Sequence, residues 1–118
     1  MAAGVAQIPW YATLFRGDQF EAAVREIAPV AMRYGATDYL VYRNRDDMYK
    51  FLHCSTFEEK AGFEAYWYGP EMVDFRTMYS GWYQVPILYT WADVVIQGGF
   101  GREPVVIGDA PQEGDTTI

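Results

Sequence analysis

Residues 37–55 read TDYLVYRNRDDMYKFLHCS, and this stretch predicts two adjacent β-strands. Thr37–Asn44 and Met48–Ser55 are rich in aromatic and aliphatic residues, and the three polar residues between them form a link of hairpin length. The strands place bulky apolar side chains on both faces, as where Tyr39 alternates with Leu40. We therefore expect a sheet that is covered on both sides.

A helix is expected before this hairpin. Asp18 and Glu21 have the spacing of a capping box, and apolar residues then recur every three or four positions. Gly35 suits the left-handed position that ends a helix, while Pro29 predicts a kink or break near its middle.

A second helical region is expected after the hairpin. Thr56 and Glu59 repeat the capping-box spacing, and Gly69-Pro70 interrupts the apolar pattern. Pro70 is well placed as the first residue of a further short helix that ends near Gly81.

Two more strands are predicted at the ends of this pattern, Trp10–Arg16 and Tyr83–Ile96. The order strand, helix, strand, strand, helical region, strand is the ferredoxin-like βαββαβ arrangement, an α+β fold. Its helices cover one face of the sheet, and an uncovered apolar face would exceed what monomers normally expose. We therefore expect a homodimer, or a higher oligomer, in which two sheets pair face to face.

Composition limits the partners and the compartment. The chain has 118 residues, 51% of them hydrophobic, which fits one domain with a sizeable core. Its net charge of −7 argues against nucleic acid. Cys54 is the single cysteine, and the sequence shows neither a signal peptide nor a membrane span, so we expect a cytoplasmic protein without membrane association.

The last part of the chain differs from the rest. We divide the sequence into a barrel domain, residues 1–98, and an acidic tail with several Gly and Pro residues, 99–118. Most of the tail is expected to be mobile. The apolar group Val105–Ile107 could instead pair with an edge strand of a partner subunit or pack on its surface, while Gln112–Ile118 stays mobile.

Aromatic residues are concentrated between positions 63 and 91, which suggests either an ordinary core or the wall of an apolar pocket. This region also includes part of the run FEEKAGFEAYW at residues 57–67. Together with the element order and the chain length, the run resembles the dimeric α+β barrel superfamily over residues 10–97. That superfamily includes antibiotic-biosynthesis monooxygenase-like, EthD-like and stress-responsive barrel proteins, and haem-degrading oxygenases.

The resemblance implies a monooxygenase-like enzyme that holds a small aromatic or polyketide-type molecule in an aromatic cavity and uses no cofactor. The haem-degrading branch is disfavoured, because its pattern has an Asn on the first strand and a His on the second helix. Here the first strand has no Asn and the histidine lies on the third strand. The alternative is a non-catalytic ligand-binding or assembly protein that uses the barrel only to dimerise.

Two residues are candidates for catalysis. His53 is the sole histidine and could act as a general base, although a structural histidine fits the sequence equally well. Arg76 could hold an anionic or phenolate oxygen, although pairing with Glu71 or Asp74 is the simpler interpretation. No second ligand at metal spacing accompanies His53, so no metal site is expected. The expected substrate-binding residues are Tyr66, Trp67, Tyr79, Tyr89 and Trp91.

Overall fold

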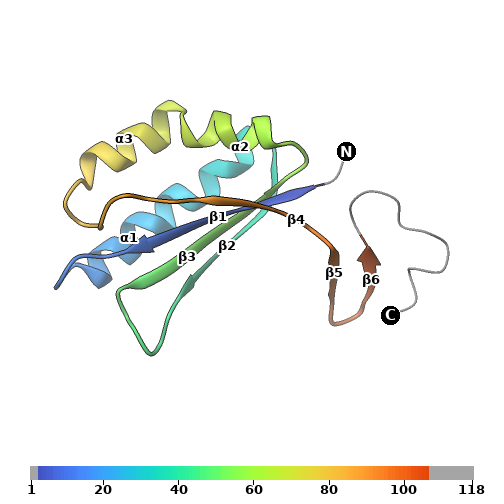
Figure 1. Cartoon of the computed structure of the whole chain (residues 1–118), viewed down its shortest axis with the longest axis horizontal. Coiled ribbons are helices and arrows are strands. Elements are labelled where there is room, and N and C mark those ends of the chain that lie inside the picture. The colour runs from blue at the N-terminus through green and yellow to red at the C-terminus, as the bar shows by residue number, and fades with distance from the viewer. Residues whose placement is uncertain (1–2, 107–118) are drawn as a thin grey trace.

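A four-stranded antiparallel sheet with helices on one face forms the body of the molecule (Figure 1). The computed structural model describes residues 3–106, with side chains as far as residue 101. The strands are β1 (Gly4–Tyr11), β2 (Ala36–Arg43), β3 (Lys50–Phe57) and β4 (Thr90–Asp93), in the spatial order β2-β3-β1-β4. This arrangement confirms the predicted α+β class and the ferredoxin-like order.

The helical layer consists of four segments. They are α1 (Gly17–Ile27), the 3-10 helix η1 (Ala28–Tyr34), α2 (Lys60–Trp67) and α3 (Pro70–Met78). The predicted break at Pro29 is confirmed, because α1 ends just before it and the chain continues as η1. Gly35 ends η1 with a φ of 96°, and Pro70 is the first residue of α3, as the sequence predicted.

Strand alternation determines which side chains enter the core. On β3, Phe51, His53, Ser55 and Phe57 are buried and face the helices. Their neighbours on β1 include Ile8 and Trp10, which are also buried. The core therefore lies between the sheet and the helical layer.

The opposite face of the sheet is open in the chain that the structure describes. It carries Leu40 and Tyr42 from β2, each about half exposed, and the partly buried Leu52 and Cys54 from β3. Figure 1 shows the helices on the other side of the sheet. The predicted double-sided apolar sheet is therefore present, and its pairing with a second sheet remains a prediction.

The first strand was predicted in the wrong place. The observed strand is Gly4–Tyr11, and the chain turns within the predicted Trp10–Arg16. Pro9 argued against a strand at this position, because proline is normally excluded from central strands. Pro9 is accommodated because β4 pairs only with Gly4–Gln7, so the β4 side of Pro9 has no ladder partner.

Both predicted capping boxes were wrong. Helix α1 begins one residue before Asp18, and the Asp18 and Glu21 carboxylates bind Arg43 instead of capping the helix. Thr56 lies inside β3, where it pairs with Val5, and α2 begins only after Glu59. In both cases the residue that was expected to cap a helix makes a contact with a distant part of the chain instead.

The last strand is shorter than predicted. Within Tyr83–Ile96, the ladder with β1 includes only Thr90–Asp93, and Tyr83 makes an isolated bridge with Ala12. The intervening segment contains Pro86, which cannot donate a ladder hydrogen bond.

A separate two-stranded hairpin follows β4. It consists of β5 (Ile96–Gly99) and β6 (Arg102–Val106), which pair antiparallel. The predicted domain boundary at residue 98 falls within β5. Ile107 and the predicted mobile segment Gln112–Ile118 lie outside the described residues.

Candidate functional site

His53 lies at the centre of a buried hydrogen-bonded chain between β1, β3 and α2. Its side chain is fully buried, and Trp10 Nε1 donates to His53 Nδ1 at 3.3 Å. Because indole is only a donor, Nδ1 must be the unprotonated nitrogen, which leaves the proton on Nε2. Nε2 lies 3.4 Å from the Tyr66 hydroxyl, which itself donates to the Ile27 carbonyl at 2.9 Å.

The buried environment keeps these hydrogen-bonded side chains uncharged. Burial lowers the pKa of His53 from 6.5 to about 4, so the imidazole is neutral at pH 7. Burial also raises the pKa of Tyr66, which keeps its phenol protonated. The accepting nitrogen of His53 is already occupied by Trp10. The predicted role as general base therefore requires that Trp10 release Nδ1 to a substrate proton.

Ser55 is a further polar group beside this chain. It lies two residues after His53 on the same face of β3, and its hydroxyl is buried with no hydrogen-bond partner among the described residues. Sequence analysis did not select Ser55, and nothing in its local sequence distinguishes it from an ordinary strand serine.

Arg76 lies on α3 with its guanidinium over the ring of Trp67. Its Cζ atom is 4.0 Å from the ring centroid, and Nη1 donates to the Trp67 carbonyl at 2.9 Å. The expected alternative, pairing with Glu71 or Asp74, is wrong, because Glu71 binds Arg33 and Tyr34 instead. No ion pair of Arg76 occurs among residues 3–101, whose side chains the structure describes.

This cation is partly withdrawn from water. Burial lowers the pKa of Arg76, although a guanidinium stays protonated at any physiological pH. The Tyr83 hydroxyl donates to the Arg76 carbonyl at 3.0 Å and so ties this turn of α3 to the segment before β4. The result is a fixed positive charge on an aromatic surface.

Aromatic side chains from β4 extend this surface. Tyr89 contacts both Phe63 and Trp67, with ring centroids 4.9 Å and 5.4 Å apart, and Trp91 stacks on Phe63. The neighbouring Tyr68 hydroxyl, as a hydrogen-bond partner, raises the pKa of Tyr89.

The predicted site residues thus form two groups. Trp67, Arg76, Tyr89 and Trp91 belong to one aromatic surface, whereas His53 and Tyr66 belong to the buried chain. Trp10 connects them, because it binds His53 and its ring lies 6.1 Å from that of Trp67.

Tyr79 lies apart from both groups. It packs between Phe75 and Trp82 and lines two shallow surface hollows beside α1. The structure therefore does not bring Tyr79 together with the other predicted substrate-binding residues.

Sequence analysis missed Trp10 and Tyr83 as members of the site. The position of Trp10 in the core follows from the bounds of β1, Gly4–Tyr11. In this strand its side chain lies on the core face with Ile8 and Ala6. A search for alternation that tolerated Pro9 would have found it.

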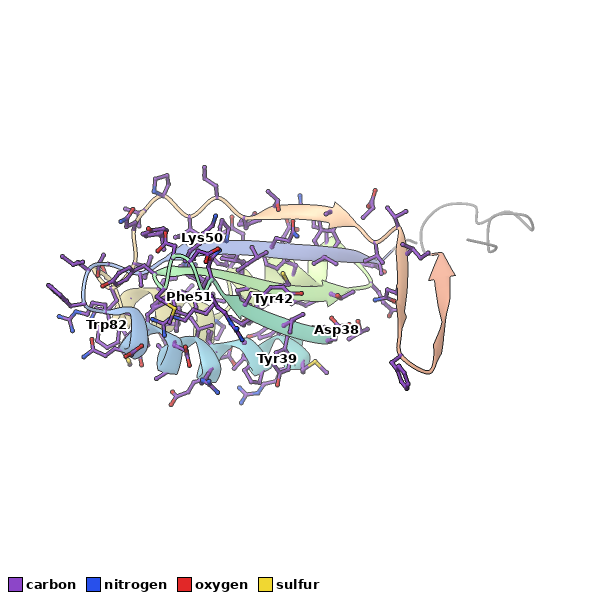
Figure 2. The ribbon with its side chains drawn as sticks, turned by 90° about the horizontal axis from the view of Figure 1, so that it is seen from below. Asp38, Tyr39, Tyr42, Lys50, Phe51 and Trp82 are labelled. Atoms are coloured by element: carbon purple, nitrogen blue, oxygen red, sulfur yellow. The ribbon has the colours of Figure 1, made fainter. Side chains whose placement is uncertain are left out.

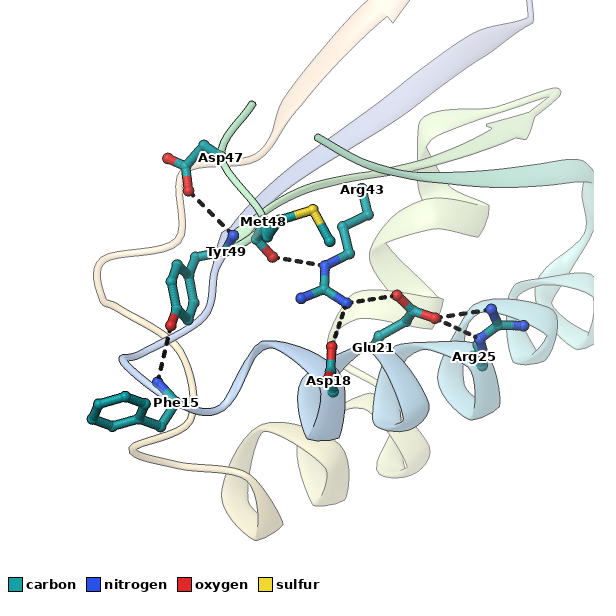
Figure 3. Close-up of polar contacts among 8 residues, drawn as sticks. All are labelled: Phe15, Asp18, Glu21, Arg25, Arg43, Asp47, Met48 and Tyr49. Carbon is teal, nitrogen blue, oxygen red and sulfur yellow. Dashed lines mark hydrogen bonds and ion pairs between the residues drawn. The ribbon is translucent and has the colours of Figure 1, made fainter. Parts of the chain in front are cut away.

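A second polar cluster joins β2 to α1 (Figure 3). Arg43 Nη1 donates to Asp18 and Glu21 at 2.9 Å, and Nε donates to the Met48 carbonyl at 2.7 Å. Hydrogen bonds from Arg25 and then from Arg43 lower the pKa of Glu21. A hollow of about 260 Å³ opens beside these groups. Because both carboxylates already bind arginine, this cluster fastens the edge strand to the helix.

The described residues offer no obvious metal centre. Among residues 3–106, no three His, Cys, Asp or Glu side chains converge as ligands would. Over the same residues, every helix is too short or too polar to cross a bilayer.

Comparisons with known proteins establish the fold. No protein-family model matches the sequence, and no curated protein matches it. Solved structures do match: a putative antibiotic biosynthesis monooxygenase from Nitrosomonas europaea aligns with 78% of this chain and 89% of its own, at 14% identity and a TM-score of 0.71.

Two further solved structures have the same fold. A putative antibiotic biosynthesis monooxygenase from Bordetella bronchiseptica aligns with 77% of this chain and 95% of its own, at 14% identity and a TM-score of 0.68. A cofactor-independent oxygenase from Streptomyces nogalater aligns with 77% and 91%, at 12% identity and a TM-score of 0.65. The chain therefore shares the fold of these solved structures.

Proposed function

We propose that this chain, which shares its fold with those oxygenases, is a cofactor-independent monooxygenase acting on a small aromatic or polyketide-type molecule. The observation that carries the proposal is Arg76. Its guanidinium is stacked on Trp67, and none of the described carboxylates pairs with it. A cation held on an aromatic surface suits a flat ligand that bears a phenolate oxygen.

The proposed reaction takes its electrons from the substrate. A phenolic substrate whose fused ring system also holds a CH₂ group binds beside Tyr89, and Arg76, stacked on the buried Trp67, stabilises its deprotonated oxygen. The electron-rich anion reduces dioxygen, so that one oxygen atom replaces two hydrogens of a ring CH₂ as a carbonyl. The other oxygen leaves with these two hydrogens as water. His53 does not reach the phenolic oxygen, because it is fully buried, its accepting nitrogen is bound by Trp10 and its pKa is lowered to about 4; the substrate hydroxyl therefore gives its proton to solvent.

We also propose that the protein acts as a homodimer through the open face of its sheet. The apolar side chains on that face, such as Leu40 and Tyr42, lie opposite the helical layer by their register with β3. A partner sheet would remove them from water, which the chain's own helices do not do. Sedimentation equilibrium should give twice the 13.5 kDa chain mass, and a monomer at micromolar concentration would contradict the pairing.

The close packing of the core favours a second candidate function. Trp10, Phe51, Phe63 and Tyr66 are all less than 2% exposed and fill the space between sheet and helices. Together with the occupied nitrogens of His53, this packing suits a non-catalytic ligand-binding or assembly protein.

Oxygen uptake and ligand binding distinguish the two candidates. We would titrate a panel of phenols and quinols, including fused-ring phenols that carry a ring CH₂, into the protein, following Trp fluorescence, and record oxygen consumption with each compound. A hydrogen bond to a charged group contributes about 1.5–3 kcal/mol, so Arg76→Gln should weaken phenolate binding by about 10–100-fold. Arg25→Gln is the matched control, because its side chain is 76% exposed.

The pH dependence sharpens this test. Affinity for a phenol should rise as the pH passes the phenol's own pKa, because Arg76 binds the anion, and Arg76→Gln should lose that rise. Binding without oxygen consumption would favour the non-catalytic function. Equal binding by the wild type and Arg76→Gln would refute the proposed site.

A further inference from the structure

A groove runs along the outer surface of the helical layer, between α1 and α3. Two hollows of about 270 and 230 Å³ open there, and Ala23, Glu26 and Tyr79 line both of them, so they form one continuous depression. The first hollow extends to Trp82, which Figure 2 shows at the end of the molecule where α1 begins, and the second follows α3. Arg76 lines neither hollow, so the groove is separate from the aromatic surface described above.

The floor of the groove is apolar. Ala23 is only 4% exposed, and its short side chain leaves room between the two helices. Ile27 and Phe75, both buried, continue the floor along α1 and α3. Met78 is 70% exposed beside them, and methionine side chains adapt readily to the shape of a partner. The floor therefore suits apolar side chains that enter from outside.

The rim of the groove is acidic. Glu26, Glu71 and Asp74 line it, and none of the described residues lining either hollow is Lys or Arg. Glu71 already binds Arg33 and Tyr34, but Glu26 and Asp74 form no ion pair within residues 3–101. These two carboxylates are therefore available to a cationic partner.

The dimensions of the groove match two turns of an α-helix. It lies beside residues 19–27 of α1, and eight steps of about 1.5 Å give a length of about 12 Å. A partner helix presents apolar side chains every three or four residues, so one can enter each hollow. Each hollow is smaller than the roughly 300–1,000 Å³ of typical small-molecule pockets, which favours a side chain as its occupant.

Charge selects the class of partner. A second copy would bring its own net charge of −7 to an acidic rim, and an anionic membrane would be repelled in the same way. We propose that the groove between α1 and α3 binds a basic amphipathic helix of another protein. Apolar side chains of that helix occupy the two hollows, and its lysines or arginines pair with the rim carboxylates. This binding does not depend on the proposed monooxygenase activity.

A designed peptide tests the groove on the full chain. The probe is a fluorescein-labelled helical peptide of about 18 residues, with leucines along one face and lysines on the other. The control peptide has the same composition, with its leucines spread around the helix. Fluorescence anisotropy should give the probe a dissociation constant about tenfold lower than the control, because only the probe buries leucines in both hollows. No binding, or equal binding of the two peptides, would overturn the proposal.

Removal of the rim charges locates the bound peptide. Glu26→Gln combined with Asp74→Asn should raise the dissociation constant of the probe about fivefold by removing two surface ion pairs. Glu58→Gln combined with Asp38→Asn removes the same two charges at exposed positions elsewhere, and Figure 2 shows Asp38 far from Trp82. This control should change the dissociation constant less than about twofold. Equal effects of the two double variants would overturn docking in the groove.

Obstruction of the groove provides an independent measurement. Ala22→Lys places a long cationic side chain in the hollow beside Trp82 and should abolish binding of the probe. Ala65→Lys on α2 is the matched control and should retain it, because both alanines are exposed and the net charge changes equally. Thermal melts confirm that both variants fold. Wild-type affinity in Ala22→Lys would contradict the proposed position of the helix.

Two competition results would assign the groove to a different occupant. Displacement of the probe by phenethylammonium at a lower concentration than by unlabelled peptide would indicate a site for a small organic cation. Dissociation of the protein's own oligomer by the peptide, followed by sedimentation, would indicate a site for a second copy. Either result would overturn the proposal.

Discussion

The protonation of His53 provides a sharp prediction, because this is the only histidine in the chain. Burial lowers its pKa from 6.5 to about 4 in the folded protein. Each pKa unit corresponds to 1.36 kcal/mol, so the difference amounts to about 3 kcal/mol of folding stability. Because the folded state disfavours the charged form, this contribution is fully present above pH 6.5 and is lost as the pH falls towards 4.

Urea denaturation between pH 7.5 and 4, at one fixed protein concentration, measures the effect. The free energy of unfolding of the wild type should fall across this window. In His53→Gln, whose amide can accept from Trp10 and donate to Tyr66, the His53 part of that fall should disappear. The difference between the two proteins isolates His53 from the carboxylates, which titrate in both.

NMR provides an independent check on the same prediction. The single imidazole resonance should not titrate between pH 7.5 and 5.5 in the folded protein. A pKa near 6.5, or identical pH profiles for wild type and His53→Gln, would refute the buried neutral chain through Trp10, His53 and Tyr66.

Two further predictions concern packing. Gly4→Ala should lower the free energy of unfolding by about 1–3 kcal/mol, because its new Cβ would lie 2.1 Å from the Trp91 ring; unchanged urea denaturation would contradict this contact. Arg43→Met should cost about 1–2 kcal/mol by removing its hydrogen bonds to α1 and the Met48 carbonyl. The exposed Arg25→Met should cost less than about 0.5 kcal/mol, and equal effects in thermal melts would show that Arg43 does not fasten β2.

The sequence predicted element type better than element position. The hairpin at residues 37–55 and the breaks at Pro29 and Gly69-Pro70 depend on local chemistry, and all are present. The first capping box failed because Arg43, more than twenty residues away from Asp18, binds its carboxylate, and the second failed because Thr56 belongs to β3. Local spacing cannot reveal a competing partner that only the fold brings close.

The sequence could indicate which residue types would form a site, but it could not indicate which of those residues lie together. The aromatic run pointed to Trp67, Tyr89 and Arg76, whose side chains the fold brings together, and their role in binding stays a prediction. For His53 the sequence left two alternatives open, a general base and a structural histidine. Its partner Trp10 lies 43 residues earlier, on a strand whose Pro9 argued against a central strand, and the hydrogen bond from Trp10 determines the tautomer of His53.

The most direct test of the central claim is a turnover experiment under ¹⁸O₂. It uses protein that has been treated with a metal chelator, together with the phenol or quinol that binds best. Cofactor-independent monooxygenation predicts one labelled oxygen in the organic product and one in water, with product formation strongly reduced in Arg76→Gln and retained in Arg25→Gln. Absence of product across the whole panel, or product that carries oxygen only from solvent, would contradict the claim.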